Sequence, residues 1–223
     1  MNKLFFSWPQ KNRALPVICV CVGQVIWGFS YLFTRIAQSS ASPTVVLSMR
    51  FLASWVIMTA LIWSGKKSFS LKGKNFRPLL ALALLEPPYY FFESYGVYYS
   101  NATFAGTVMA FAPVVGILAA MLFLGEKPTR RQKIFSLLPT AGVIIITSVG
   151  SSMGIVKPLG AIFLFASQIV AAGMKLYNKK SSEEFSSFER TYAIVVANAI
   201  IFTIKSMIDL HGDVPVSYTH LTL

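Results

Sequence analysis

Histidine, cysteine and acidic residues are scarce in this sequence. Among its 223 residues are 8 Asp and Glu against 20 Lys and Arg, with two histidines and two cysteines. Both histidines, His211 and His220, follow the last long apolar segment, and the sequence contains no paired-histidine metal motif, no nucleophile elbow and no glycine-rich phosphate loop. These absences argue against an enzyme, and we expect no catalytic residues, no cofactor and no metal site.

The two cysteines also exclude a disulfide framework. Cys19 and Cys21 lie two residues apart within one apolar segment, where a helix would point their side chains in widely different directions. They lack the company of further metal-ligating residues. We expect both to be small apolar packing residues.

Long apolar runs are what the sequence has in abundance. Hydrophobic residues make up 55% of the chain, and its mean hydropathy is +0.61. A helix crosses a hydrocarbon core of about 30 Å with about 20 apolar residues. The sequence therefore predicts an all-α polytopic transmembrane helix bundle in a lipid bilayer, and its first apolar run is too long for the core of a cleaved signal peptide. Seven segments have the required length: 14–37, 44–64, 78–99, 103–124, 132–149, 158–178 and 190–208.

The positive charge is distributed in a way that is typical of membrane topology. Fifteen of the 20 Lys and Arg lie in the N-terminal segment or in every second connection between apolar segments. A nucleic-acid-binding protein would gather them on one face or tail, so we expect no nucleic-acid partner. Because cytoplasmic connections are rich in Lys and Arg, the sequence predicts a multi-pass protein of the cell membrane with a cytoplasmic N-terminus.

The third apolar segment contains the most unusual residues. Glu86 and Glu93 are seven positions apart, so a helix places them on nearly the same face, and the pair Pro87–Pro88 is expected to bend that helix. A charge at the bilayer centre costs about 2.5–3.5 kcal/mol, which favours a polar cavity or a partner. Since a desolvated carboxyl group takes up a proton more readily, both glutamates are candidates for the substrate or ion pathway and for proton coupling. Alternatively, one of them lies near the membrane surface or pairs with Arg50.

Four further residues are candidates for lining a substrate or ion pathway. Arg50, in the second segment, either binds an anionic group of the substrate or forms an ion pair with a glutamate. Tyr90 belongs to a dense aromatic patch that suits a substrate cavity. Gln24 and Trp27 are polar or amphipathic groups in the first segment, where packing hydrogen bonds are the alternative. Lys175, by contrast, is expected to extend its long side chain to the cytoplasmic surface.

The last two apolar segments weakly repeat the first two. A shift of 145 residues places Gly173 on Gly28 and Lys180 on Arg35. Five segments separate the starts of the two copies, and an odd number inverts the second copy relative to the first. Many secondary transporters are built in this way.

Several short motifs together resemble the EamA-type members of the drug/metabolite transporter superfamily. The resemblance covers residues 14–149 as one complete five-helix repeat and 158–208 as the first two helices of a second, inverted repeat. The motifs are Trp27–Gly28, Pro43, Arg50–Phe51, Tyr99–Ser100–Asn101–Ala102, Ala105, Pro113, Gly125–Glu126, Gln132 and Gly142, and the run from Tyr98 to Gly142 is the most specific part.

This resemblance implies a ten-helix inverted repeat with a central cavity, which exports amino acids or other small metabolites, often by coupling to an ion gradient. Three helices of that plan are missing, so the chain is expected to be C-terminally truncated. Residues 209–223 are expected to form a non-membrane tail, of which about 216–223 is not native sequence.

Together these observations predict a secondary-active transporter that exports a small-molecule substrate by alternating access. A non-transporting membrane scaffold or assembly subunit is the alternative from another class, although it gives no reason for charged residues and prolines at mid-depth. An inactive fragment of a transporter is a further alternative. The sequence leaves open whether the protein forms a homodimer.

Overall fold

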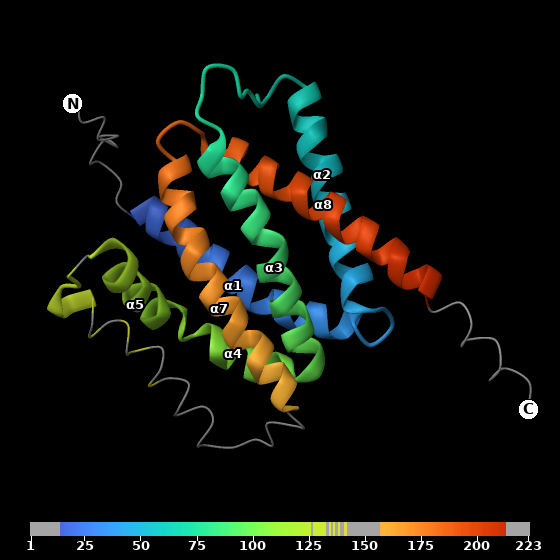
Figure 1. The fold of residues 1–223 in the computed structure, drawn as a ribbon, viewed down its shortest axis with the longest axis vertical. Coiled ribbons are helices and arrows are strands. Elements are labelled where there is room, and N and C mark those ends of the chain that lie inside the picture. Colours follow the sequence, from blue (N-terminus) through green and yellow to red (C-terminus); the bar gives the residue numbers. More distant parts are fainter. Residues whose placement is uncertain are drawn as a thin grey trace, which may run out of the picture.

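The described part of the chain is helical apart from its connections. The computed structural model describes residues 14–125, 127–132, 134, 136, 138, 141 and 157–212. No strand occurs among these residues, which confirms the predicted all-α fold. The predicted span 132–149 and the tail after residue 212 lie largely or wholly outside them. Figure 1 shows the helices, which are α1 (Ala14–Ala37), α2 (Pro43–Trp63), α3 (Arg77–Tyr99), α4 (Ala102–Met109), α5 (Ala112–Leu124), α7 (Pro158–Ser181) and α8 (Ser187–Gly212).

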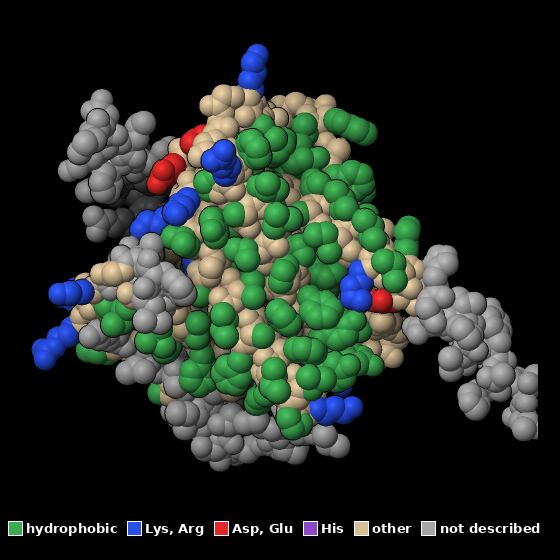
Figure 2. All heavy atoms as spheres, in the orientation of Figure 1, with side chains coloured by type: hydrophobic (Ala, Val, Ile, Leu, Met, Phe, Trp, Pro, Cys, Tyr) green, Lys and Arg blue, Asp and Glu red, His purple; other side chains and the backbone are tan. Residues whose placement is uncertain are grey.

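The surface of the bundle suits a lipid environment. On α7, the side chains of Ile162, Phe165 and Ile169 are more than half exposed. Figure 2 shows hydrophobic side chains over the middle of one face, with Lys and Arg around its margin. Together with the length of the helices, this confirms a multi-pass membrane protein. Four helical segments of the described residues are long and apolar enough to cross a membrane: Val17–Ala37, Pro43–Trp63, Pro158–Ser181 and Ser187–Leu210.

The predicted fourth span is interrupted, so the expectation of one helix over 103–124 is wrong. Helix α4 ends at Met109 and α5 begins at Ala112, with a turn at Ala110 and Phe111 between them. Pro113 explains the position of this break. Its ring would clash with the carbonyl group four residues earlier, at Met109, and its nitrogen has no hydrogen to donate to that group. By contrast, α3 continues as one helix through its own proline pair, and the bend predicted there stays a prediction.

Helix α3 is the centre around which the other helices pack. It contacts α1, α2, α4, α7 and α8, and Figure 1 shows it between α7 on one side and α8 with α2 on the other. The contact with α7 is close where the C-terminal end of α3 meets the N-terminal end of α7, because each helix has a glycine there. Gly96 of α3 faces Leu164, and Gly160 of α7 lies against the backbone of Tyr99 and Ser100. Small residues let membrane helices approach in this way.

Replacing Gly160 with alanine is expected to destabilise the protein by about 1–3 kcal/mol, the usual range for overpacking. A Cβ at this position would lie 2.9–3.0 Å from backbone atoms of Tyr99 and Ser100, which cannot move aside as a flexible side chain can. Thermal unfolding in detergent micelles measures the effect. Gly23→Ala is the matched control, because a Cβ there meets no described atom within 4 Å. Equal stability of the two variants would contradict the close packing of α7 on α3.

Helices α2 and α8 pack antiparallel through three polar pairs. The Thr44 hydroxyl donates to Asp209 at 2.9 Å, and Thr59 meets Tyr192 at 3.3 Å near the opposite end. The third pair, Ser48 and Thr203, lies between them with its hydroxyl oxygens 3.1 Å apart. The antiparallel packing is what an inverted second repeat would require of its second helix, although the repeat itself stays a prediction.

Candidate functional site

An open cavity of about 820 Å³ lies between α1, the α4–α5 break and α7, and we call it the main cavity. Its walls are largely apolar with a few polar groups, the composition usual for a small-molecule site. The lining residues include both predicted residues of α1. They are Gln24, Trp27, Gly28, Tyr31, Leu32, Tyr89, Ala102, Thr103, Gly106, Met109, Ala110, Ala112, Pro113, Gln168, Ala171 and Lys175.

Glu93 is buried beside the main cavity and is held by two tyrosines. Its side chain is 5% exposed, and its Oε1 accepts hydrogen bonds from the hydroxyls of Tyr31, at 2.8 Å, and Tyr89, at 2.9 Å. Both tyrosines also line the main cavity. Glu93 itself lines a cavity of about 10 Å³ between α1, α2 and α3, the size needed for about one water molecule. Tyr31 and Tyr89 therefore connect the carboxyl group of Glu93 to the main cavity.

Glu86 lies in a different environment. It is 8% exposed and, within the described part of the chain, makes no hydrogen bond or ion pair. It lines a second open cavity, of about 480 Å³, together with Tyr90 and Arg190. This second cavity shares Trp27, Tyr89, Ala171 and Lys175 with the main cavity, so the two are adjacent. Glu86 and Glu93 thus come from one helix but face separate spaces.

Arg50 stacks on aromatic rings and pairs with neither glutamate. Its guanidinium carbon lies 5.3 Å from the ring centre of Tyr90 and 5.7 Å from that of Phe51. Among the described residues it forms no ion pair, but it lines the same small cavity as Glu93. Of the predicted pathway residues, Gln24 and Trp27 therefore meet at the main cavity and Glu86 with Tyr90 at the second cavity, while Arg50 and Glu93 lie beside the small one.

Tyr31 and Gln168 line the main cavity but were not predicted from the sequence, and Lys175 lines it although another role was predicted for it. The prediction that Lys175 extends to the cytoplasmic surface is wrong, because its Nζ donates to the carbonyl oxygen of Ala112, at the start of α5, at 3.2 Å. A charged residue inside the apolar segment 158–178 was the available signal. No group of three His, Cys, Asp or Glu among the described residues could hold a metal ion.

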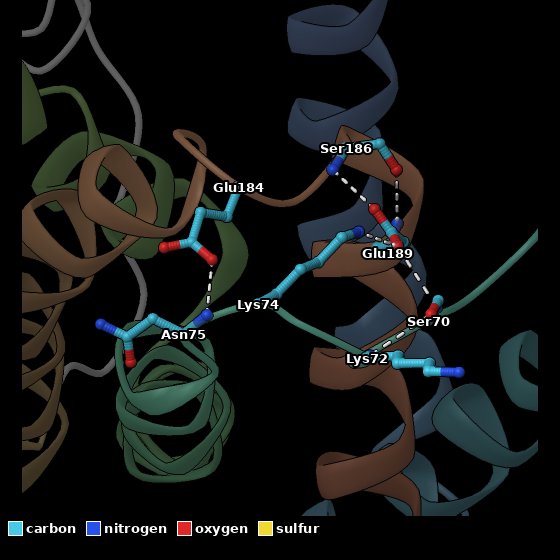
Figure 3. A network of polar contacts seen from close by, with 7 residues as sticks. All are labelled: Ser70, Lys72, Lys74, Asn75, Glu184, Ser186 and Glu189. Carbon is cyan, nitrogen blue, oxygen red and sulfur yellow. Dashed lines mark hydrogen bonds and ion pairs between the residues drawn. The ribbon is translucent and has the colours of Figure 1, made fainter. Parts of the chain in front are cut away.

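A network of polar contacts joins the α2–α3 loop to the α7–α8 connection, as Figure 3 shows. Glu189 and Ser186 form a capping box, in which the Ser186 amide donates to Glu189 at 2.8 Å and the Glu189 amide donates to the Ser186 hydroxyl at 3.2 Å. The other Glu189 oxygen accepts from the Ser70 amide at 3.3 Å and from Lys74 Nζ at 2.6 Å. This places both connections at the same end of the bundle, as the charge pattern requires.

Comparisons with known proteins point to one family. The model of the EamA-like transporter family matches residues 14–148. The uncharacterized transporter YcxC of Bacillus subtilis is 30% identical over 205 residues, which cover 91% of this chain and 65% of that protein. An uncharacterized transporter of Archaeoglobus fulgidus is 22% identical over 200 residues, covering 88% and 70%. The uncharacterized inner membrane transporter YedA of Escherichia coli is 25% identical over 185 residues, covering 82% and 59%. The matched region thus spans about two thirds of the length of these relatives.

Proposed function

Because the chain belongs to the EamA-like transporter family, we propose that it exports small metabolites, amino acids or similar compounds, by secondary-active transport across the cell membrane. The N-terminus would be cytoplasmic, and the substrate would bind in the main cavity. Alternating access would expose this cavity to each side of the membrane in turn. Residues 14–149 would form the first five-helix repeat and 158–208 the first two helices of the inverted second repeat.

The observation that supports this proposal most is the meeting of an open cavity with a broken helix. Irregular backbone at membrane depth is tolerated where it is buried in protein or lines a cavity. In secondary transporters, discontinuous helices form the substrate site between the two repeats. Here the α4–α5 break lines a cavity of about 820 Å³ that α1 and α7 also line, and α7 is the first helix of the proposed second repeat. A membrane scaffold would have no need for such a cavity.

Proton coupling is the part of the proposal that the glutamates support. Glu93 would bind and release the proton that drives transport. Tyr31 and Tyr89 link it to the main cavity, and a hydroxyl group can both donate and accept a hydrogen bond, so either could pass a proton on. Arg50, which lines the same small cavity, would balance the charge of the ionised Glu93. Glu86, which has no hydrogen-bond or ion-pair partner among the described residues, would contact the substrate or bind a second proton.

The proposal is tested by uptake of a pooled set of metabolites into proteoliposomes that contain the full gene product, with and without a pH gradient. We expect at least one metabolite to accumulate above the level in protein-free liposomes, and to do so more when the gradient is imposed. Accumulation that is equal with and without the pH gradient would exclude proton coupling. The absence of any accumulation would favour the membrane scaffold.

Filling the main cavity should reduce this uptake several-fold. Gly106 lines the cavity, and a Cβ there would meet no described atom within 4 Å, so Gly106→Phe adds a ring where the substrate is proposed to bind. Gly23→Phe is the matched control, because that position is equally open but does not line the cavity. Initial uptake rates of the two variants are compared, and we expect the rate to fall for Gly106→Phe but not for Gly23→Phe. Both variants must elute as monodisperse protein from size-exclusion chromatography. If both retain the uptake of the unaltered protein, the substrate does not bind in this cavity.

A further inference from the structure

Lys175 is the one charged residue among the described residues that line the main cavity. The other polar lining groups are neutral, and no carboxyl group from the described part of the chain lines this cavity. Glu93 does not line it and is hydrogen-bonded to Tyr31 and Tyr89, which do. The cavity therefore has a positive charge on its wall, and because Lys175 is an exposed residue, its ammonium group is accessible to a ligand.

The position of this ammonium group is set by the broken helix. Nζ of Lys175 donates to the carbonyl oxygen of Ala112, and a Cβ on Gly116 would lie 2.7 Å from Nζ, so the glycine is what lets the lysine approach. Two turns earlier on α7, Gln168 donates to the sulfur of Met109 at 2.7 Å. Because Met109 ends α4 and Ala112 begins α5, these two side chains of α7 hold the two sides of the break.

The ammonium group is not neutralised within the described part of the chain. It has three N–H donors, and among the described residues its one hydrogen-bond partner is the Ala112 carbonyl. It forms no ion pair with any described carboxylate. Glu86 lines the adjacent second cavity with Lys175 but makes no ion pair with it. An anion in the cavity could accept charge-assisted hydrogen bonds from the remaining N–H groups of the ammonium. Across the cavity, Trp27, Tyr31 and Tyr89 offer aromatic surface.

We propose that the main cavity selects substrates in which a single carboxylate is attached to an apolar, preferably aromatic body, and that Lys175 binds the carboxylate. The aromatic side chains of α1 and α3 would contact the body. This inference rests on the proposed function, because it assigns a substrate class to the same cavity. The sequence instead makes Arg50 a candidate for binding an anionic group of the substrate. Arg50 lines the small cavity beside Glu93 and does not line the main cavity.

Three probes of nearly equal shape test the charge preference: 3-phenylpropanoate, 3-phenylpropanamide and 3-phenylpropylamine. Equilibrium binding to the purified protein in nanodiscs is measured for each. We expect the unaltered protein to bind the acid at least about tenfold more tightly than the amide, since a hydrogen bond to a charged group contributes more than one between neutral groups. The amine should bind most weakly.

Lys175→Met should remove this preference by weakening acid binding about tenfold while leaving amide binding nearly unchanged. Lys175→Arg, which keeps the charge, should restore most of the preference. Lys66→Met is the matched control, because Lys66 is an exposed residue of the α2–α3 connection. Size-exclusion profiles show whether each variant is folded, and Lys175→Gln replaces Lys175→Met if the latter aggregates.

An acid preference that persists in Lys175→Met and Lys175→Gln would overturn the assignment to Lys175. Equal binding of the three probes by the unaltered protein would overturn the substrate class but leave the proposed transport function standing. If the unaltered protein binds none of the probes while the pooled uptake assay succeeds, the substrate class is wrong but the proposed transport function stands. If both assays fail, the cavity is not a substrate site at all.

Discussion

Replacing Glu93 with glutamine is expected to abolish the dependence of transport on the pH gradient without disrupting the fold. Glutamine keeps the oxygen that accepts hydrogen bonds from Tyr31 and Tyr89, at 2.8 and 2.9 Å in the unaltered protein. It cannot bind or release a proton in the physiological range. The variant therefore separates the two roles of this side chain, that of proton carrier and that of hydrogen-bond acceptor.

Glu93→Ala should in addition destabilise the protein, because it removes the acceptor itself. Two buried hydroxyl groups would lose their partner, and each unsatisfied group costs about 1–3 kcal/mol. We therefore expect a loss of about 2–6 kcal/mol in the free energy of unfolding for Glu93→Ala and little change for Glu93→Gln. Thermal unfolding in detergent micelles measures both.

Glu86 provides the matched control on the same helix. Because it makes no hydrogen bond or ion pair with any described residue, Glu86→Ala should change stability much less than Glu93→Ala. Transport by Glu93→Gln that still follows the pH gradient would show that another group carries the proton. Equal destabilisation by the two alanine variants would instead contradict the assignment of Tyr31 and Tyr89 as partners of Glu93.

Helix positions in this protein could be predicted from sequence because bilayer thickness fixes the length of an apolar run. The predicted segments 14–37, 78–99 and 158–178 differ from α1, α3 and α7 by at most three residues at either end. The α4–α5 break could not be predicted from proline content alone. Pro113 interrupts its helix, whereas Pro87 and Pro88 lie within a continuous one. Whether a proline breaks a helix depends on neighbours that can satisfy the freed carbonyl groups, and those come from other helices.

The residues of the candidate site could likewise be predicted only in part. The high energy of a charge in hydrocarbon was enough to single out Glu86 and Glu93, and both are buried. Their surroundings could not be derived in this way. Tyr31 lies 62 positions from Glu93 in the sequence, and Lys175 reaches α5 rather than the membrane surface. A local pattern shows that a residue needs a partner, but only the packing of α1, α3 and α7 shows which partner it has.

Replacing Glu189 with alanine is expected to destabilise the end of the bundle where the α2–α3 loop meets the α7–α8 connection. One carboxylate there accepts hydrogen bonds from the amides of Ser186 and Ser70 and pairs with Lys74 (Figure 3). The Glu189 side chain is 8% exposed and that of Lys74 is 27% exposed, so the ion pair is only partly screened by water. Loss of a helix cap costs about 0.5–2 kcal/mol, and removing one partner of a shielded ion pair adds to this. We expect a total loss of about 3 kcal/mol in thermal unfolding.

Glu189→Gln divides this loss into its two parts. Glutamine at this position can still accept from the Ser186 amide and preserve the capping box, but it cannot pair with the charge of Lys74. Its loss should therefore be smaller, about 1 kcal/mol, as for partly exposed ion pairs. A double-mutant cycle with Lys74→Met should give a coupling energy of the same size.

The control for these variants is Glu183→Ala, which removes a carboxylate from the same connection between α7 and α8. Glu183 is exposed, and its carboxylate has no partner among the described residues, so its replacement should be nearly neutral. If Glu183→Ala and Glu189→Ala unfold at the same temperature, the contacts of Glu189 do not hold the two connections together. If only Glu189→Ala is destabilised, the contacts of Glu189 help to hold the α2–α3 loop against the α7–α8 connection, beside the hydrogen bond from the Asn75 amide to Glu184. Under the proposed alternating access, these contacts would be strained or broken whenever the bundle opens at this end.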